Sequence, residues 1–430
     1  MPFAVYVLGL GVFCLNTTEI MVAGLIPGMS SDLGVSIAAI GYLVSLFAVG
    51  MVVGGPVLIV GLSRVAQKKS LILLLAVFVA GQTLAAMAAD YWVLVIARIV
   101  TALAASAFFG AAAAVCVRLV GAERRGRAMS VLYGGMMVAQ VAGLPTATFI
   151  EQHFGWRASF WIVDLLAVGC IAAVVLLVPG GGGAQTLDFR TEIQAFRNLR
   201  LWGAYATNAL VIGAVVAGFT YLSPIFTDAT HFAPATVPVL FAVYGIATVL
   251  GNAVVGRFAD RYTRRILVGG LIALTLVLVA FALCVSYKVP TIVTTVLLGL
   301  IGLPLNPAMA ARVMSVSNEG ALVNTVNGSA VNIGVVLGPW LGGLGISAGL
   351  GLVAPLWIGA GMALLGLFTL LPDLRRGATR DPRQDAALDS RRGAASDPRR
   401  GAAPTPRRGA LGDRPASAPE ERGSIPVRDR

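Results

Sequence analysis

Three ionisable residues lie inside stretches of the sequence that are apolar enough to cross a lipid bilayer: Glu19, Arg98 and Asp164. Burying a charge within a membrane is expensive, so each is a candidate for function. Burial favours the neutral form of a carboxyl group, whereas a neighbouring guanidinium favours the charged form. A glutamate near an arginine is therefore suited to loading and releasing a proton. We predict that Glu19 and Arg98 form a proton-coupling site, and the alternative is that they form a structural pair.

The positions of Glu19 and Arg98 within their spans favour a contact between them. At about 1.5 Å per residue, a depth of about seven residues places both roughly 10 Å below the same membrane surface. Asn16 shares a helical face with Glu19, and Thr101 shares one with Arg98. We predict that Asn16 and Thr101 line a substrate cavity beside the coupling site.

The composition indicates that these spans belong to a membrane protein. Of the 430 residues, 57% are hydrophobic and 12% are charged, whereas soluble domains carry about 25% charged residues. The net charge of +12 lies in alternate short loops and in the C-terminal tail, which indicates membrane topology rather than nucleic-acid binding. The four cysteines lie in apolar runs without metal-ligand spacing. No nucleotide-binding loop or nucleophile and base pair is recognisable, so we expect no catalytic residue, no cofactor, no metal and no enzyme.

Apolar runs of about the 20 residues that a transmembrane helix needs recur along the chain. They predict an all-α polytopic membrane protein with twelve transmembrane helices in two six-helix repeats. The predicted spans lie near residues 3–26, 37–62, 70–89, 91–117, 127–149, 159–178, 201–225, 236–256, 266–286, 289–311, 322–345 and 350–371. We expect an N-terminal six-helix bundle (1–178), a cytoplasmic linker (179–200), a C-terminal six-helix bundle (201–371) and a disordered tail rich in Arg, Ala, Gly and Pro (372–430).

The distribution of Lys and Arg predicts the orientation. The loops on one side carry most of these residues, whereas the loops on the other side hold only Arg157 and Lys288. Because cytoplasmic loops carry an excess of basic residues, both termini are predicted to be cytoplasmic. The N-terminus lacks a basic region before its apolar run, so we expect a retained first span rather than a cleaved signal peptide.

Small residues recur on single faces of spans five and eleven. Gly135 and Gly143 precede Pro145 in span five, and Gly334 is followed by Gly338 in span eleven. Such stripes let helix backbones pack closely, and proline adds a kink. We therefore assign these five residues to helix packing and bending.

Three further polar side chains complete the predicted substrate cavity: Asn208 and Tyr221 near span seven, and Asn306 on span ten. Asn306 lies between Pro304 and Pro307, in a segment that must interrupt the regular helix. The alternative for each polar side chain is an interhelical hydrogen bond.

A short polar stretch, GRFADRYTRR, interrupts two apolar runs and is predicted to be a loop between spans eight and nine. We expect Gly256 to permit a tight helix exit and Asp260 to lie near a helix end or to pair with an arginine. The other members of this conformational loop are Arg261, Arg264 and Arg265. The stretch resembles the signature G-x-x-x-D-R-x-G-R-R of the major facilitator superfamily, with Thr263 in place of the usual Gly. The resemblance gives Asp260 and Arg261 a role in conformational change.

Other motifs resemble the drug and sugar efflux branch of that superfamily, including its chloramphenicol and arabinose efflux permeases. Glu19 stands in NTTEIM, similar to a context on helix one of this branch, and span five resembles its antiporter motif, with Leu144 between the Gly and the Pro. The resemblance covers about residues 1–371. It implies that helices one and four line the cavity, and that span six, which carries Asp164, is a peripheral support. We therefore expect a structural or interfacial role for Asp164.

The resemblance implies a bacterial cell-membrane protein that exports a small amphipathic compound, such as chloramphenicol, by proton antiport with alternating access. The expected partners are a small-molecule substrate, protons and the lipid bilayer but no nucleic acid, and we expect a monomer. The alternatives are a sugar or metabolite efflux permease, an uptake symporter, and a transport-inactive sensor or intramembrane enzyme. Proton flux that depends on substrate would separate the transporters from the last class.

Overall fold

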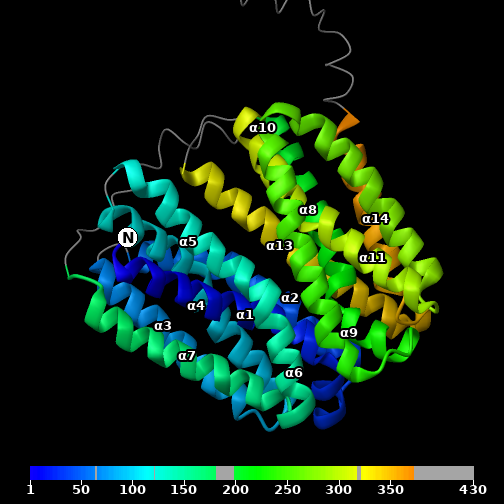
Figure 1. The fold of residues 1–430 in the computed structure, drawn as a ribbon, viewed down its shortest axis with the longest axis horizontal. Helices are drawn as coiled ribbons and strands as arrows, with labels where there is room; N and C mark the ends of the chain where they lie inside the picture. Colours follow the sequence, from blue (N-terminus) through cyan, green and yellow to red (C-terminus); the bar gives the residue numbers. More distant parts are fainter. Residues whose placement is uncertain (63–64, 121, 181–197, 317–320, 372–430) are drawn as a thin grey trace, which may run out of the picture. The chain divides into compact units, whose positions relative to one another are not determined.

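The computed structural model describes residues 1–62, 65–120, 122–180, 198–316 and 321–371, and this part of the chain is helical without strands (Figure 1). In these ranges, eleven helices are long and apolar enough to span a membrane, and Ala354–Phe368 is apolar but shorter. The predicted fold class, with twelve transmembrane helices in two repeats, is confirmed. Residues 181–197 of the predicted linker (179–200) and the predicted tail over 372–430 lie outside the described residues.

The first six membrane crossings follow one another with short connections, and the fifth is divided by a π-helical turn. The elements are α1 (Phe3–Leu33), α2 (Ile37–Leu62), α3 (Gln67–Ala86), α4 (Tyr91–Leu119), η1 (Ala122–Arg124), α5 (Arg125–Val138), the π turn η2 (Ala139–Gly143), α6 (Leu144–Phe154) and α7 (Trp156–Leu177). In the π turn the N–H of Leu144 donates to the carbonyl of Ala139, five residues earlier. Pro145, which has no N–H, follows directly.

The second six crossings have more interruptions. The elements are α8 (Leu199–Thr220), α9 (Leu222–Pro224), η4 (Ile225–Ala229), η5 (Pro234–Thr236), α10 (Val237–Cys284), α11 (Lys288–Ile301), η6 (Leu303–Leu305), α12 (Asn306–Val316), α13 (Ala321–Gly345), η7 (Ile346–Leu350) and α14 (Ala354–Phe368). The predicted interruption beside Asn306 is confirmed, because the 3₁₀ turn η6 separates α11 from α12.

The stretch Gly256–Arg265 joins two membrane spans, Pro234–Ala259 and Arg261–Cys284, as predicted, but it is helical rather than a loop. These residues belong to the long helix α10, in which only Tyr262 has non-helical backbone angles (φ −126°, ψ 26°). Gly256 lies inside the helix with open space around the position of a Cβ, so it is not a helix exit. The polar residues of this stretch keep their backbone in helical form on both sides of the kink, and the break is confined to one residue.

The two ends of the membrane region differ in charge. We call the end that holds the start of α1 and the exposed Arg124 and Arg261 the basic end. The opposite end, the Asp32 end, holds the short connections from α1 to α2 and from α6 to α7. There Arg157 forms a salt bridge with Asp32 and donates to the Ala88 carbonyl at 2.8 Å. This cluster ties the start of α7 to the ends of α1 and α3.

The two halves of the chain contact each other towards the Asp32 end. The Ser45 hydroxyl on α2 donates to the Val336 carbonyl on α13 at 2.8 Å. The Ser223 hydroxyl on α9 donates to the Gly24 carbonyl on α1 at 3.3 Å. Both bonds join the first six crossings to the second six, and we call this region the interbundle contact.

Aromatic rings fill the interbundle contact where glycines leave room for them. A Cβ on Gly41 of α2 would overlap the Tyr221 ring, which follows α8. A Cβ on Gly343 of α13 would overlap both Tyr221 and Tyr42. Because these glycines have no side chain, α2 and α13 can approach closely around the two tyrosines.

Glycines of the predicted stripes also lie at close helix approaches. A Cβ on Gly135 would overlap the Gly9 carbonyl of α1, and one on Gly143 would overlap Thr17 of the same helix. Gly338 of α13 lies equally close to the Gly213 carbonyl of α8. Each of these positions brings a backbone against a neighbouring helix.

Candidate functional site

Arg98 lies in the interior of the first bundle, where its side chain is 1% exposed. Its Nη1 donates to the Thr18 carbonyl at 2.7 Å, and its Nη2 donates to the Glu19 carbonyl at 3.3 Å. The guanidinium carbon lies 4.2 Å from the centre of the Phe47 ring, within the range of a cation–π contact. Arg98 therefore connects α4 to the backbone of α1 and to a side chain of α2.

Glu19 is half-buried and meets Arg98 through its carbonyl rather than its carboxylate. Among the described residues, the ion pair within 4.0 Å is Arg157 with Asp32, so the structural pair considered for Glu19 and Arg98 is not formed in this state. This arrangement holds α1 by its backbone and leaves the Glu19 carboxyl group available to a proton or a cationic group.

Asn16 and Thr101 are both buried, and their polar groups bond to backbone carbonyls. The Asn16 amide donates to the Met136 carbonyl of α5 at 3.4 Å. The Thr101 hydroxyl donates to the Ala97 carbonyl of its own helix at 2.9 Å, and its methyl group packs against Gly81 of α3. In this state, both predicted cavity residues therefore serve helix packing, because their faces of α1 and α4 are covered by neighbouring helices.

The polar residues predicted for the second half have different surroundings. The Asn208 amide donates to Asn327 Oδ1 at 2.6 Å and so joins α8 to α13. The Tyr221 hydroxyl donates to the Pro339 carbonyl at 2.8 Å, and the ring is fully buried in the interbundle contact. Asn306 is exposed at the start of α12. The alternative of an interhelical hydrogen bond thus describes Asn208 and Tyr221, whereas Asn306 keeps the exposure that a substrate contact needs.

The arginine-rich kink of α10 lies at the basic end. The guanidinium carbons of Arg261 and Arg265 lie 5.3 and 5.9 Å from the centre of the Tyr262 ring, and Arg264 is exposed. The side chain of Asp260 lies outside the described part of the structure, so its conformational role stays a prediction.

Asp164 is buried between α7 and α3. Its Oδ2 accepts a hydrogen bond from the Thr83 hydroxyl at 2.9 Å, and its Oδ1 has no hydrogen-bond partner among the described residues. This hydrogen bond joins α7 to α3. It agrees with the structural role expected for Asp164.

Arg312 is a buried ionisable residue that lies just beyond the predicted span 289–311. Its Nη1 donates to the Thr207 hydroxyl at 2.5 Å, and its Nη2 donates to the Thr369 carbonyl at 3.5 Å. The two threonine hydroxyls lie 2.6 Å apart. Arg312 therefore joins α12 to α8 and to the residue after α14. The helix continues past it to Val316, and the signal in the sequence was that Val313 and Met314 after it are apolar.

Comparison with known proteins determines the family. The profile described as Major Facilitator Superfamily matches the chain twice, over residues 8–234 and 221–416. The chain belongs to the major facilitator superfamily. The second match runs past residue 371, so the resemblance reaches further than the sequence analysis placed it.

This member of the superfamily is similar along most of its length to curated bacterial proteins. It is 33% identical to the inner membrane transport protein YdhP of Escherichia coli K12. The aligned 365 residues cover 84% of this chain and 94% of YdhP. It is 32% identical over 384 residues to the chloramphenicol resistance protein of Streptomyces lividans, with 86% and 96% covered. The transporter is therefore a multi-pass membrane protein and not an enzyme, as predicted.

A solved structure shares the fold. The crystal structure of the peptide transporter POT in complex with alafosfalin matches with a TM-score of 0.68 at 12% identity, over 87% of this chain and 95% of that chain. At this identity the likeness concerns the fold alone, and it agrees with two bundles of six membrane crossings.

Proposed function

We propose that this transporter exports a small amphipathic compound in exchange for protons by alternating access. The basic end faces the cytoplasm, together with both termini, because the cytoplasmic ends of membrane helices carry the excess of Lys and Arg. The interbundle contact lies towards the opposite end, and this supports a cycle in which that end opens to release the compound while the basic end closes. The transporter works as a monomer, in which the two bundles supply both walls of the pathway.

The position of Glu19 relative to the interbundle contact is the observation that carries the coupling role. Ser223 bonds to the carbonyl of Gly24 on α1, and Glu19 lies five residues before Gly24 on the same helix. At about 1.5 Å per residue, the backbone of Glu19 lies about 7.5 Å from that of Gly24 along the helix axis, on the side of the basic end. A proton-binding group at this place changes the side of the membrane that it faces when the interbundle contact opens and the basic end closes.

Arg98 tunes the coupling site by position and charge. Its two bonds to the carbonyls of Thr18 and Glu19 hold the turn of α1 that carries the carboxyl group. Its charge opposes full neutralisation of Glu19, so the proton is held weakly enough to be released. A substrate with a cationic or hydrogen-bonding group competes with the proton for the same carboxyl group, which links the two fluxes.

The substrate class is supported by a relative. The Streptomyces lividans protein is named for chloramphenicol resistance, and it is similar to this transporter across both bundles. An amphipathic antibiotic is therefore the substrate class that we propose first, and sugars or other metabolites are the alternative substrate class.

Transport by purified protein in liposomes tests this function. With an acidic lumen and chloramphenicol outside, an antiporter accumulates the compound in the lumen as protons leave. An uptake symporter requires the opposite pH gradient, and a transport-inactive sensor gives no substrate-dependent proton flux. A susceptibility panel of antibiotics and sugar analogues in an efflux-deficient host identifies the substrate class.

Glu19→Gln tests the coupling residue. The amide mimics the protonated carboxyl group, so accumulation driven by the pH gradient should be lost while binding of a neutral compound persists. Glu123→Gln is the matched control, because Glu123 is an exposed carboxylate at the basic end and its loss should leave transport unchanged. Accumulation that survives in Glu19→Gln would remove Glu19 from the coupling mechanism.

A further inference from the structure

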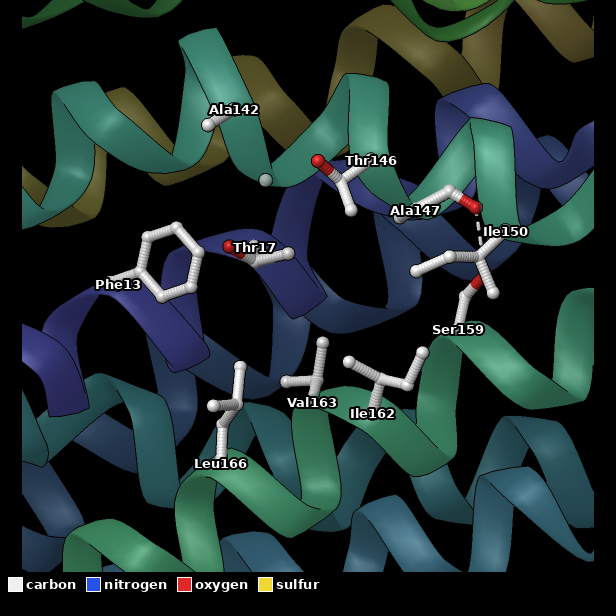
Figure 2. A pocket seen from close by; sticks show the side chains of 11 residues that line it. Phe13, Thr17, Ala142, Thr146, Ala147, Ile150, Ser159, Ile162, Val163 and Leu166 are labelled. Atoms are coloured by element: carbon white, nitrogen blue, oxygen red, sulfur yellow. Dashed lines mark hydrogen bonds between the residues drawn. The ribbon is translucent and has the colours of Figure 1, made fainter.

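A cavity of about 100 Å³ lies between α1, the fifth crossing and α7, away from the interbundle contact (Figure 2). Its floor is formed by Phe13 and Thr17 of α1. One wall comes from η2 and α6 and the other from α7. The lining residues of these two walls are Ala142, Gly143, Thr146, Ala147, Ile150, Ser159, Ile162, Val163 and Leu166.

The π turn and the small residues around it account for this space. The wall of the fifth crossing presents Ala142, Gly143 and Ala147, which leave a gap opposite the larger side chains of α7. Gly143 lies so close to Thr17 that a Cβ would overlap the threonine side chain. The fifth crossing therefore contacts α1 closely at Gly143. Beside this contact, its small side chains leave a space between it and α7.

The cavity opens on the face of the bundle that meets the bilayer. Ile162 and Leu166, on the wall formed by α7, are 41% and 40% exposed, and Ala142 and Thr146 on the opposite wall are exposed as well. All four residues lie on membrane-spanning helices. The medium in front of the opening is therefore the hydrocarbon of the membrane, and the cavity is continuous with the lipid-facing surface.

The lining selects a hydrocarbon group over water. The Ser159 hydroxyl is already bonded to the Ala147 carbonyl at 2.7 Å, as Figure 2 shows. Thr17 contributes a buried hydroxyl without a hydrogen-bond partner among the described residues, but a bound water needs two to four polar partners. Apolar cavities stay dry, and one of about 150 Å³ holds a benzene ring. The smaller cavity here suits a narrower group, such as a polymethylene chain.

We propose that this cavity is a binding site for one acyl chain of a bilayer lipid. The chain enters between Ala142 and Ile162 and ends against Phe13 and Thr17 of α1. It fills the gap beside the π turn and so supports the bend of the fifth crossing. The site is independent of which compound the transporter exports, because it lies on the lipid side of the first bundle.

Photocrosslinking of the full-length protein tests the site. The protein is reconstituted in phosphatidylethanolamine and phosphatidylglycerol vesicles that contain phosphatidylcholine with a diazirine in its acyl chain, and adducts are mapped to residues by mass spectrometry. We expect adducts on Phe13 or Thr17, together with adducts on Leu165, which faces the lipid on α7 with 68% exposure. Labelling of Leu165 without labelling of Phe13 or Thr17 would overturn the proposal.

Ala142→Phe fills the mouth of the cavity from an exposed position and should lower the adducts on α1 at least fivefold while Leu165 stays labelled. Ala172→Phe is the matched control, since Ala172 is exposed on α7 but does not line the cavity. Ala142→Leu, a smaller change, replaces Ala142→Phe if the latter fails to fold, and should lower the adducts in the same direction. Unchanged adducts in a folded Ala142 variant would overturn the proposal, whatever the transport activity.

Discussion

Loss of the Ser45 hydroxyl should shift the transporter towards the state that is open at the Asp32 end. Ser45 Oγ donates to the Val336 carbonyl at 2.8 Å, from α2 to α13, and this bond must break when the two bundles separate there. A hydrogen bond contributes a net ~1 kcal/mol, and 1.4 kcal/mol corresponds to a tenfold change in an equilibrium constant. For Ser45→Ala we therefore expect the ratio of open to closed populations at the Asp32 end to rise about fivefold.

Double electron–electron resonance measures this ratio. Spin labels on Ser31, at the end of α1, and on Ala235, in η5, lie on exposed positions of the two bundles, in a background without the native cysteines. Ser130→Ala is the control, because the Ser130 hydroxyl bonds to the Gly126 carbonyl of its own helix and so does not join the two bundles. A distance distribution that is the same in Ser45→Ala and in the parent, or an equal shift in the control, would refute the gating role of the Ser45 bond.

Two further substitutions test the packing of each bundle. Gly338→Ala places a methyl group against a carbonyl of α8 and should lower stability by about 1–3 kcal/mol. Gly328→Ala, in open space on the same helix, should stabilise the protein by up to about 1 kcal/mol. The two thermal unfolding midpoints in detergent should therefore move in opposite directions. Arg98→Lys keeps the charge but loses one of the two bonds to the backbone of α1, so we expect about 2 kcal/mol lower stability and slower transport. Arg118→Lys, at the exposed end of the same helix, is the control and should change neither stability nor transport.

The number and order of the membrane crossings could be predicted from the sequence because each span needs a long apolar run, and few other structures satisfy the backbone in lipid. The same counting predicted that Glu19 and Arg98 meet, since helical rise converts sequence position into depth, and Arg98 does contact the backbone of Glu19. The form of this contact did not follow from the sequence. Whether an arginine reaches a carboxylate or a nearby carbonyl depends on side-chain torsions and on the neighbouring helix, here Phe47 of α2.

Interactions between crossings were the least predictable part. Arg312 was placed just beyond a predicted span because its charge ended an apolar run, yet Thr207 and the Thr369 carbonyl make its burial possible. The interbundle contact is built from Ser45 and Ser223, whose types carry no distinctive signal in a membrane helix. Such residues are recognised only once the pairing of helices from the two halves is known.

We propose that the helical form of the predicted loop gives that stretch a mechanical role. α10 approaches the fifth crossing at Gly245, where a Cβ would meet the Gln140 carbonyl, and its kink at Tyr262 lies 17 residues further along the helix, a rise of about 25 Å. Because the backbone is helical up to Tyr262, no flexible segment lies between Gly245 and the kink. A movement of Gly245 against the fifth crossing would therefore also displace the basic end of this helix.

Asp260 lies two residues before this kink, and a charge change there should alter the position that the rigid helix adopts at the basic end. Asp260→Asn keeps the size of the side chain and removes its charge, so we expect transport to fall while the thermal unfolding midpoint stays unchanged. Thr263→Val, which lies one residue after the kink and leaves the charge unchanged, is the control and should transport normally. Normal transport by Asp260→Asn would reduce the stretch to a topology signal, and loss of folded protein would give Asp260 a structural role instead.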